Sequence, residues 1–108
     1  MPRKRQISEM ELAQTRIKER LWNGEEYDSI PALTKHGIER YINEGVPPGG
    51  FLEAVFQNNL FRAVTRADKA NIKALPYIVR FIWNNAPADC HGSTDSVLKW
   101  QMDQNMFS

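Results

Sequence analysis

The sequence predicts an all-α fold, a compact bundle of about five short helices. Apolar residues recur at helical spacing along most of the 108-residue chain, and no stretch alternates with period two as a half-buried strand does. Residues that start and end helices separate the apolar segments. Ser8, Asp68 and Ser93 stand at predicted starts, and Gly45 stands at a predicted end.

The first predicted helix belongs to residues 1–24, a basic N-terminal segment. Residues 8–11, Ser-Glu-Met-Glu, form a capping box, and Gly24 follows the predicted end of the helix. The apolar stripe between them is narrow. We therefore expect this helix to be an appendage that packs at the edge of a core domain, residues 34–102, or on a second copy, as in a homodimer. The stripe consists of Met10, Ala13, Ile17 and Leu21.

The second predicted helix opens the core domain. Residues 25–33 have no clear period and contain Pro31, which indicates a connector. Thr34 is the predicted N-cap, and the helix should run through Asn43 and end at Gly45. Its inward face should consist of Ile38, Tyr41 and Ile42.

A proline-glycine corner leads into the third predicted helix. Residues 46–50 read Val-Pro-Pro-Gly-Gly. Proline fixes φ and glycine permits positive φ, so the corner should have one defined shape. Asn58 and Asn59 then predict a break, because asparagine competes for backbone hydrogen bonds, and residues 60–67 resume helical character. The apolar face of the third helix is Phe51, Leu52, Val55 and Phe56.

Two further helices complete the predicted bundle. Asp68 should cap a segment in which Pro76 either introduces a kink or marks the true start. A loop over residues 84–92 precedes Ser93, the predicted cap of the last helix. Among the aromatic residues, Phe51, Phe56 and Phe81 should be buried, whereas Trp22 is a candidate anchor for a partner.

Composition indicates a soluble cytoplasmic protein. The chain is 42% hydrophobic and 25% charged, and no apolar run approaches the roughly 20 residues that span a bilayer. We therefore expect no association with a membrane. The single cysteine, Cys90, excludes an internal disulfide.

Charge is unevenly distributed along the chain. Residues 1–24 hold six Lys/Arg and three Glu, whereas the remainder holds eight Lys/Arg and ten Asp/Glu. A basic head is one route to nucleic-acid binding, for which Arg3, Lys4 and Arg5 are the candidates. The alternative is an ordinary basic terminus.

Several motifs follow one another between residues 34 and 100, namely Arg40-Tyr41-Ile42, 45–55, Asn58-Asn59-Leu60, Arg66-Ala67-Asp68, Asn71, 78–82, Cys90-His91-Gly92-Ser93 and Trp100. Their order resembles that of a recurrent family of small, uncharacterised phage and prophage proteins. The resemblance implies an accessory phage protein and no particular chemistry. The chain departs from the family pattern at Asn59, where an aspartate is usual.

The strongest candidate site is the corner itself. Gly49 and Gly50 would expose backbone N–H groups at a helix start, where an anion is favoured. The alternative is a tight corner that uses glycine only for its backbone conformation. Guanidinium groups for a phosphate are available from Arg40, Arg62 and Arg66, and stacking rings for a base from Tyr41 and Trp83.

Two polar groups extend this candidate site. Arg66 and Asp68, with Asn71 one turn later, would contact a ligand or form a helix cap and an ion pair. Asn58 and Asn59 would bind a nucleobase edge or satisfy backbone groups at the helix break.

Catalytic chemistry has little support in the sequence. Cys90 and His91 are adjacent, which rarely allows a nucleophile and its base to meet, and His36 is the only other histidine. One cysteine and two histidines without ligand spacing do not form a metal site. We expect no catalytic residues, no metal and no cofactor.

These observations predict a non-catalytic phage accessory protein that binds and sequesters or blocks a target in the infected cell, for counter-defence or host takeover. The target would be an anionic, nucleotide-like ligand at the corner. The alternatives are a host or defence protein docked by a helical face, and nucleic acid bound by the basic N-terminus.

Overall fold

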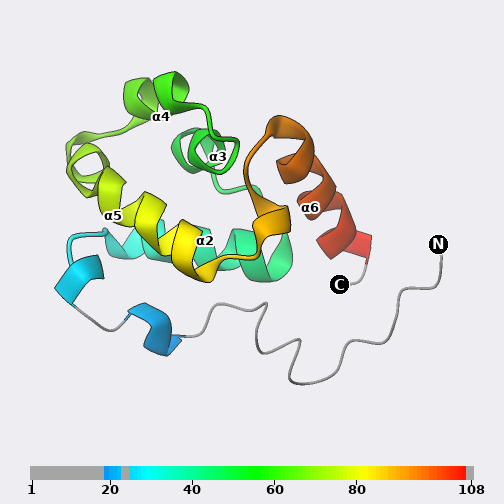
Figure 1. The fold of residues 1–108 in the computed structure, drawn as a ribbon, viewed down its shortest axis with the longest axis horizontal. Coiled ribbons are helices and arrows are strands. Elements are labelled where there is room, and N and C mark those ends of the chain that lie inside the picture. The colour runs from blue at the N-terminus through cyan, green and yellow to red at the C-terminus, as the bar shows by residue number, and fades with distance from the viewer. Residues whose placement is uncertain (1–18, 23–24, 107–108) are drawn as a thin grey trace.

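The computed structural model describes residues 19–22 and 25–106, and within them the chain is all-α (Figure 1). These residues contain five α-helices and three short 3-10 turns, which confirms the predicted all-α fold. The elements are η1 (Glu19–Trp22), η2 (Glu25–Tyr27), α2 (Ala32–Glu44), α3 (Gly50–Phe56), α4 (Leu60–Arg66), α5 (Lys69–Asn85), η3 (Ala88–Cys90) and α6 (Thr94–Met106).

Most of the first predicted helix, including its capping box, lies outside the described residues. Its last part does not. Residues 19–22 form η1, and Leu21 and Trp22 pack with the core of the protein. Trp22 was a candidate anchor for a partner, but the structure buries it, so this alternative is wrong.

Helix α2 contributes several of the buried residues of the core. It begins at Ala32, directly after Pro31, whose fixed φ suits a helix start. The predicted cap, Thr34, is therefore wrong: it lies inside the helix, buried, and its hydroxyl donates to Oδ1 of Asn71 at 2.6 Å. The helix ends at Gly45 as predicted, with φ 72°.

The end of α2 also fixes the position of α6. A Cβ on Gly45 would lie 2.6 Å from Cβ of Gln104, so only glycine permits this approach of the two helices. Helix α6 begins as predicted, because Oγ of Ser93 accepts a hydrogen bond from N of Ser96 at 3.1 Å.

Helix α5 is one continuous element of 17 residues. Oδ1 of Asp68 caps it by accepting from N of Asn71 at 2.8 Å, as predicted. Pro76 lies inside this helix and does not mark its start. Its side chain is exposed, on the side of the helix that faces away from the core.

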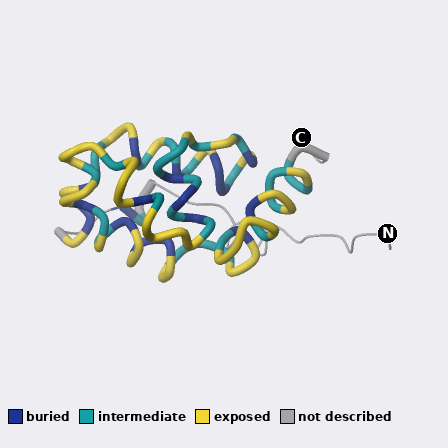
Figure 2. Tube along the Cα trace, turned by 90° about the horizontal axis from the view of Figure 1, so that it is seen from above, coloured by how far each residue is buried: buried dark blue, intermediate teal, exposed yellow. Residues whose placement is uncertain are grey.

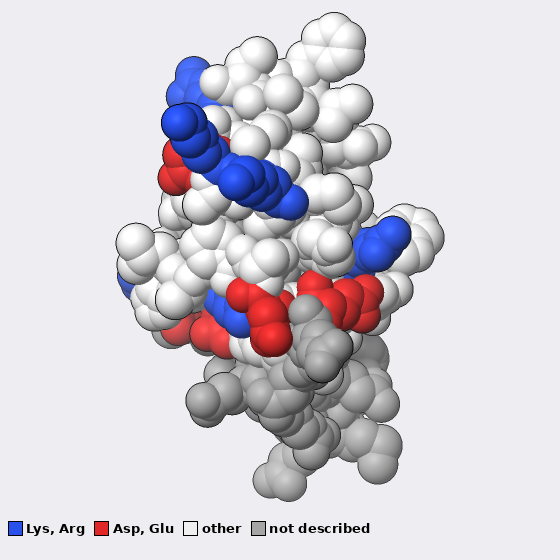
Figure 3. All heavy atoms as spheres, turned by 90° about the vertical axis from the view of Figure 1, so that its left-hand side faces the viewer, with Lys and Arg blue, Asp and Glu red and all other residues white. Residues whose placement is uncertain are grey.

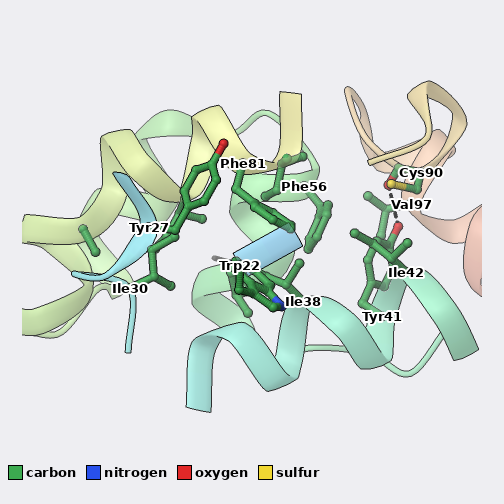
Figure 4. Packing of buried hydrophobic residues seen from close by; sticks show 14 residues of the cluster. Trp22, Tyr27, Ile30, Ile38, Tyr41, Ile42, Phe56, Phe81, Cys90 and Val97 are labelled. Carbon is green, nitrogen blue, oxygen red and sulfur yellow. Dashed lines mark hydrogen bonds between the residues drawn. The ribbon is translucent and has the colours of Figure 1, made fainter. Parts of the chain in front are cut away.

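The core forms where α2, α3, α5 and α6 converge, and buried residues follow the inner sides of the helices (Figure 2). Phe56 and Phe81 are fully buried as predicted, whereas Phe51 is only partly buried. Trp22 stacks on Phe81 with ring centroids 3.7 Å apart, and Tyr27 meets Phe81 edge-on at 5.1 Å (Figure 4).

Tyr41 connects four elements from the middle of this core. Its hydroxyl donates to the carbonyl oxygen of Cys90 at 2.6 Å (Figure 4). Its own carbonyl accepts from Nε1 of Trp100 at 3.1 Å. Its ring contacts Phe56, with centroids 4.3 Å apart. These contacts join α2 to α3, η3 and α6.

We predict that Tyr41→Phe destabilises the fold by about 1 to 3 kcal/mol, because the substitution leaves a buried carbonyl without its donor. Urea unfolding followed by circular dichroism measures this change. Tyr77→Phe, on a partly buried ring of α5, is the matched control and should change the unfolding free energy little. Equal effects of the two substitutions would contradict the role assigned to the Tyr41 hydroxyl.

Candidate functional site

The proline-glycine corner joins α2 to α3 through a segment without regular secondary structure that ends at Gly49. This glycine has φ 92° and ψ 166°, a conformation that is essentially restricted to glycine, and it is exposed. Helix α3 begins immediately afterwards at Gly50. The corner therefore has the defined backbone shape that its sequence indicates.

Arg66 of α4 reaches back over this corner. A Cβ on Gly50 would lie 2.9 Å from Nη1 of Arg66, so the guanidinium rests against the backbone where a side chain would otherwise stand. Contacts between α3 and α4 hold the two elements together. The structure thus brings together three residues that the sequence proposed for one site, namely Gly49, Gly50 and Arg66.

The two candidates on α2 differ in accessibility. Tyr41 is fully buried in the core, so no face of its ring is open for stacking, and its assignment as a ligand contact is wrong for this structure. The side chain of Arg40 is exposed on α2, where Nε lies 3.9 Å from Oε1 of Glu44. Burial raises the pKa of the Tyr41 phenol, which therefore remains a hydrogen-bond donor.

The predicted helix break between α3 and α4 lies at Asn58 and Asn59. Asn58 has φ 62°, and Oδ1 of Asn59 accepts from N of Arg62 at 3.1 Å as the cap of α4. The carboxylate of Asp68 is likewise occupied in capping α5. For Asn59 and Asp68 the hydrogen bonds are those of helix caps, while the side chain of Asn58 is exposed.

Cys90 and His91 do not form a reactive pair. Cys90 is fully buried, and burial raises the pKa of its thiol to about 12. A thiol in this state is protonated at neutral pH and is a poor nucleophile. Burial also lowers the pKa of His91, which favours the neutral ring. Within the described residues, no group of three His, Cys, Asp or Glu side chains is placed to hold a metal ion.

Trp83 is the one proposed stacking residue with an open ring. Its side chain is 76% exposed near the end of α5, and its ring centroid lies 6.5 Å from that of His91. Sequence reasoning missed the surface on which it stands. Ile72 and Val79 are also exposed on α5.

The candidates Arg3, Lys4 and Arg5 lie outside the described residues. In comparisons of the chain with protein-family models, with curated proteins and with solved structures, nothing matches. Among the described helices, none combines the length and apolar character needed to cross a bilayer.

We predict that Gly49→Ala destabilises the fold by about 1 to 3 kcal/mol, because alanine is strained at this backbone conformation. Thermal and urea unfolding measure the loss. Gly50→Ala is the matched control: it lies in α3, lacks positive φ, and meets only the mobile end of Arg66. Retained stability in Gly49→Ala would contradict the conformation described for the corner.

We predict that the Cys90 thiol resists iodoacetamide at pH 8 in the native protein and reacts readily in urea. It is the only cysteine, so mass spectrometry measures one labelling rate. Because the unfolded thiol ionises near pH 9 and the folded one only at about 12, the unfolded state loses its proton first. Stability should therefore fall as the pH rises above 9. Rapid labelling of the native protein would contradict the burial of the Cys90 thiol.

Proposed function

We propose that the protein is a non-catalytic phage accessory protein that sequesters an anionic, nucleotide-like ligand at the proline-glycine corner. It would act in the cytoplasm of the infected cell, in counter-defence or host takeover. The resemblance of residues 34–100 to small phage proteins supports the biological setting. The observation that carries the proposal is the position of the Arg66 guanidinium over Gly50.

The charge of Arg66 favours an anion at this corner. Among the described residues, no carboxylate lies within ion-pair distance of Arg66, and its side chain is exposed. A guanidinium presents several N–H donors in a planar fork that matches two oxygens of a phosphate. Arg62, half-buried one turn earlier in α4, adds a second positive charge.

The backbone of the corner supports the same ligand class. Gly49 has no side chain, and nothing lies within 4 Å of the position that its Cβ would occupy. A phosphate can therefore approach the main chain closely there. Helix α3 has only seven residues, so we assign the main attraction to Arg66 and not to the helix dipole.

A binding role is favoured over catalysis because the side chains that could act as nucleophile, acid or base have structural roles. The thiol of Cys90 is protonated and enclosed, and the hydroxyl of Tyr41 is committed to the Cys90 carbonyl. Asp68 is occupied as a helix cap. A protein of this kind acts by lowering the free concentration of its target, so its effect depends on its affinity and on its abundance.

We predict that Arg66→Ala weakens nucleotide binding by about 10- to 100-fold, the loss expected for a charge-assisted hydrogen bond of roughly 1.5 to 3 kcal/mol. Isothermal titration calorimetry over mono-, di- and cyclic nucleotides provides the measurement. Gly50→Ala should also weaken binding, because its methyl group displaces the guanidinium, while the fold is retained.

Arg40→Ala is the matched control, since that guanidinium lies beside Glu44 on α2 and should leave the affinity unchanged. Native mass spectrometry of protein purified from an infected host adds an unbiased readout, in which a retained mass of a few hundred daltons identifies the ligand class. Absence of binding across the nucleotide series, together with a bare mass, would overturn the proposal.

A further inference from the structure

The outer side of α5 carries an apolar stripe that no other described part of the chain covers. Ile72, Val79 and Trp83 are 36%, 48% and 76% exposed, and Pro76 between them is exposed as well. Positions spaced by four, three and four residues lie on one side of a helix. The core side of α5 consists of other residues, namely Ala74, Ile78, Phe81 and Ile82.

A basic stripe runs beside the apolar one. Lys69, Lys73 and Arg80 are exposed and fall on the neighbouring strip of the same helix, which contains no acidic residue. The guanidinium of Arg80 lies 5.9 Å from the ring centroid of Tyr77. In the part of the chain that the structure describes, none of these three cations is paired with a carboxylate.

The segment of the chain that contains α5 is rich in basic residues. Residues 54–88 contain a single acid, Asp68, whereas residues 25–53 contain more acids than bases. In Figure 3, which views the left-hand end of Figure 1, most acidic side chains lie in the lower part of the face, and uncharged surface dominates above them. The five cations of residues 54–88 are Arg62, Arg66, Lys69, Lys73 and Arg80.

We infer that the outer face of α5 docks an acidic amphipathic helix of a partner protein. The apolar side of that helix would cover Ile72, Val79 and Trp83, and its carboxylates would meet Lys69, Lys73 and Arg80. Both stripes extend over about three turns of α5, which accommodates a partner helix with apolar anchors at i, i+3 or i+4, and i+7. This surface is distinct from the proline-glycine corner, and the inference does not depend on ligand binding at that corner.

The chemistry of the stripe favours a protein over other polyanions. Ile72 and Val79 are aliphatic and offer no ring to a nucleobase, so nucleic acid would leave half of the apolar surface unused. A membrane surface requires a helix that can sink its apolar face into the lipid. Helix α5 is held by its opposite side in the core, and its exposed apolar stripe is narrow.

The test uses the full chain and a fluorescein-labelled synthetic peptide of about 18 residues, with leucine at i, i+4, i+7 and i+11 and glutamate on the neighbouring strip. Fluorescence anisotropy measures affinity for this peptide and for a scrambled peptide of equal composition. We expect the patterned peptide to bind at least tenfold more tightly. Val79→Asp should weaken its binding at least tenfold, while Leu33→Asp, at an exposed leucine of α2, should leave it unchanged.

A charge exchange makes the test specific. The double variant Lys73→Glu, Arg80→Glu should lose the glutamate peptide and bind a peptide in which lysine replaces glutamate. Circular dichroism checks that each variant is folded, which is expected because all substituted side chains are exposed. These outcomes are independent of the nucleotide titrations, so either proposal can fail alone.

Three results would overturn the inference. The first is equal affinity for the patterned and scrambled peptides. The second is sedimentation showing that Val79→Asp converts an oligomer of the protein alone into monomers, which would assign the face to a second copy. The third is a single-stranded oligonucleotide that binds the wild-type protein more tightly than the patterned peptide does and fails to bind Lys73→Glu, Arg80→Glu.

Discussion

The hydrogen bond from the Tyr41 hydroxyl to the Cys90 carbonyl is the contact on which the arrangement of the helices depends. A phenol in an apolar core must find an acceptor, because an unpaired buried hydroxyl costs free energy. The acceptor is the last residue of η3, so this bond fixes the segment between α5 and α6 against α2. Trp100 and Phe56 then pack around the same tyrosine, which orients α6 and α3.

This use of Tyr41 determines what is left for binding. The side chains nearest the centre of the protein pack against one another and are closed to a ligand. Accessible functional groups lie where helices begin, end or face outward. Two such accessible regions are the proline-glycine corner and the outer side of α5. They differ in chemistry: one places a single guanidinium against exposed main chain, and the other combines aliphatic surface with several cations.

The sequence predicted well the features that depend on near neighbours. Caps at Asp68 and Ser93 were found because a cap needs only its own next turn, and Gly45 ended α2 for the same reason. Thr34 and Tyr41 were misassigned because their partners, Asn71 and Cys90, are distant in sequence. The helical period of α5 also did not distinguish its core side from its outer side, because apolar residues occupy both.

The three tryptophans occupy three different environments, which gives the protein built-in optical reporters. Trp22 is buried and stacked on Phe81, Trp100 is partly buried, and Trp83 is exposed to solvent. Emission from an enclosed indole lies at shorter wavelength than emission from a hydrated one. Collisional quenchers therefore reach Trp83 before the others, and the quenchable fraction of the fluorescence reports on the outer side of α5 while the remainder reports on the integrity of the core.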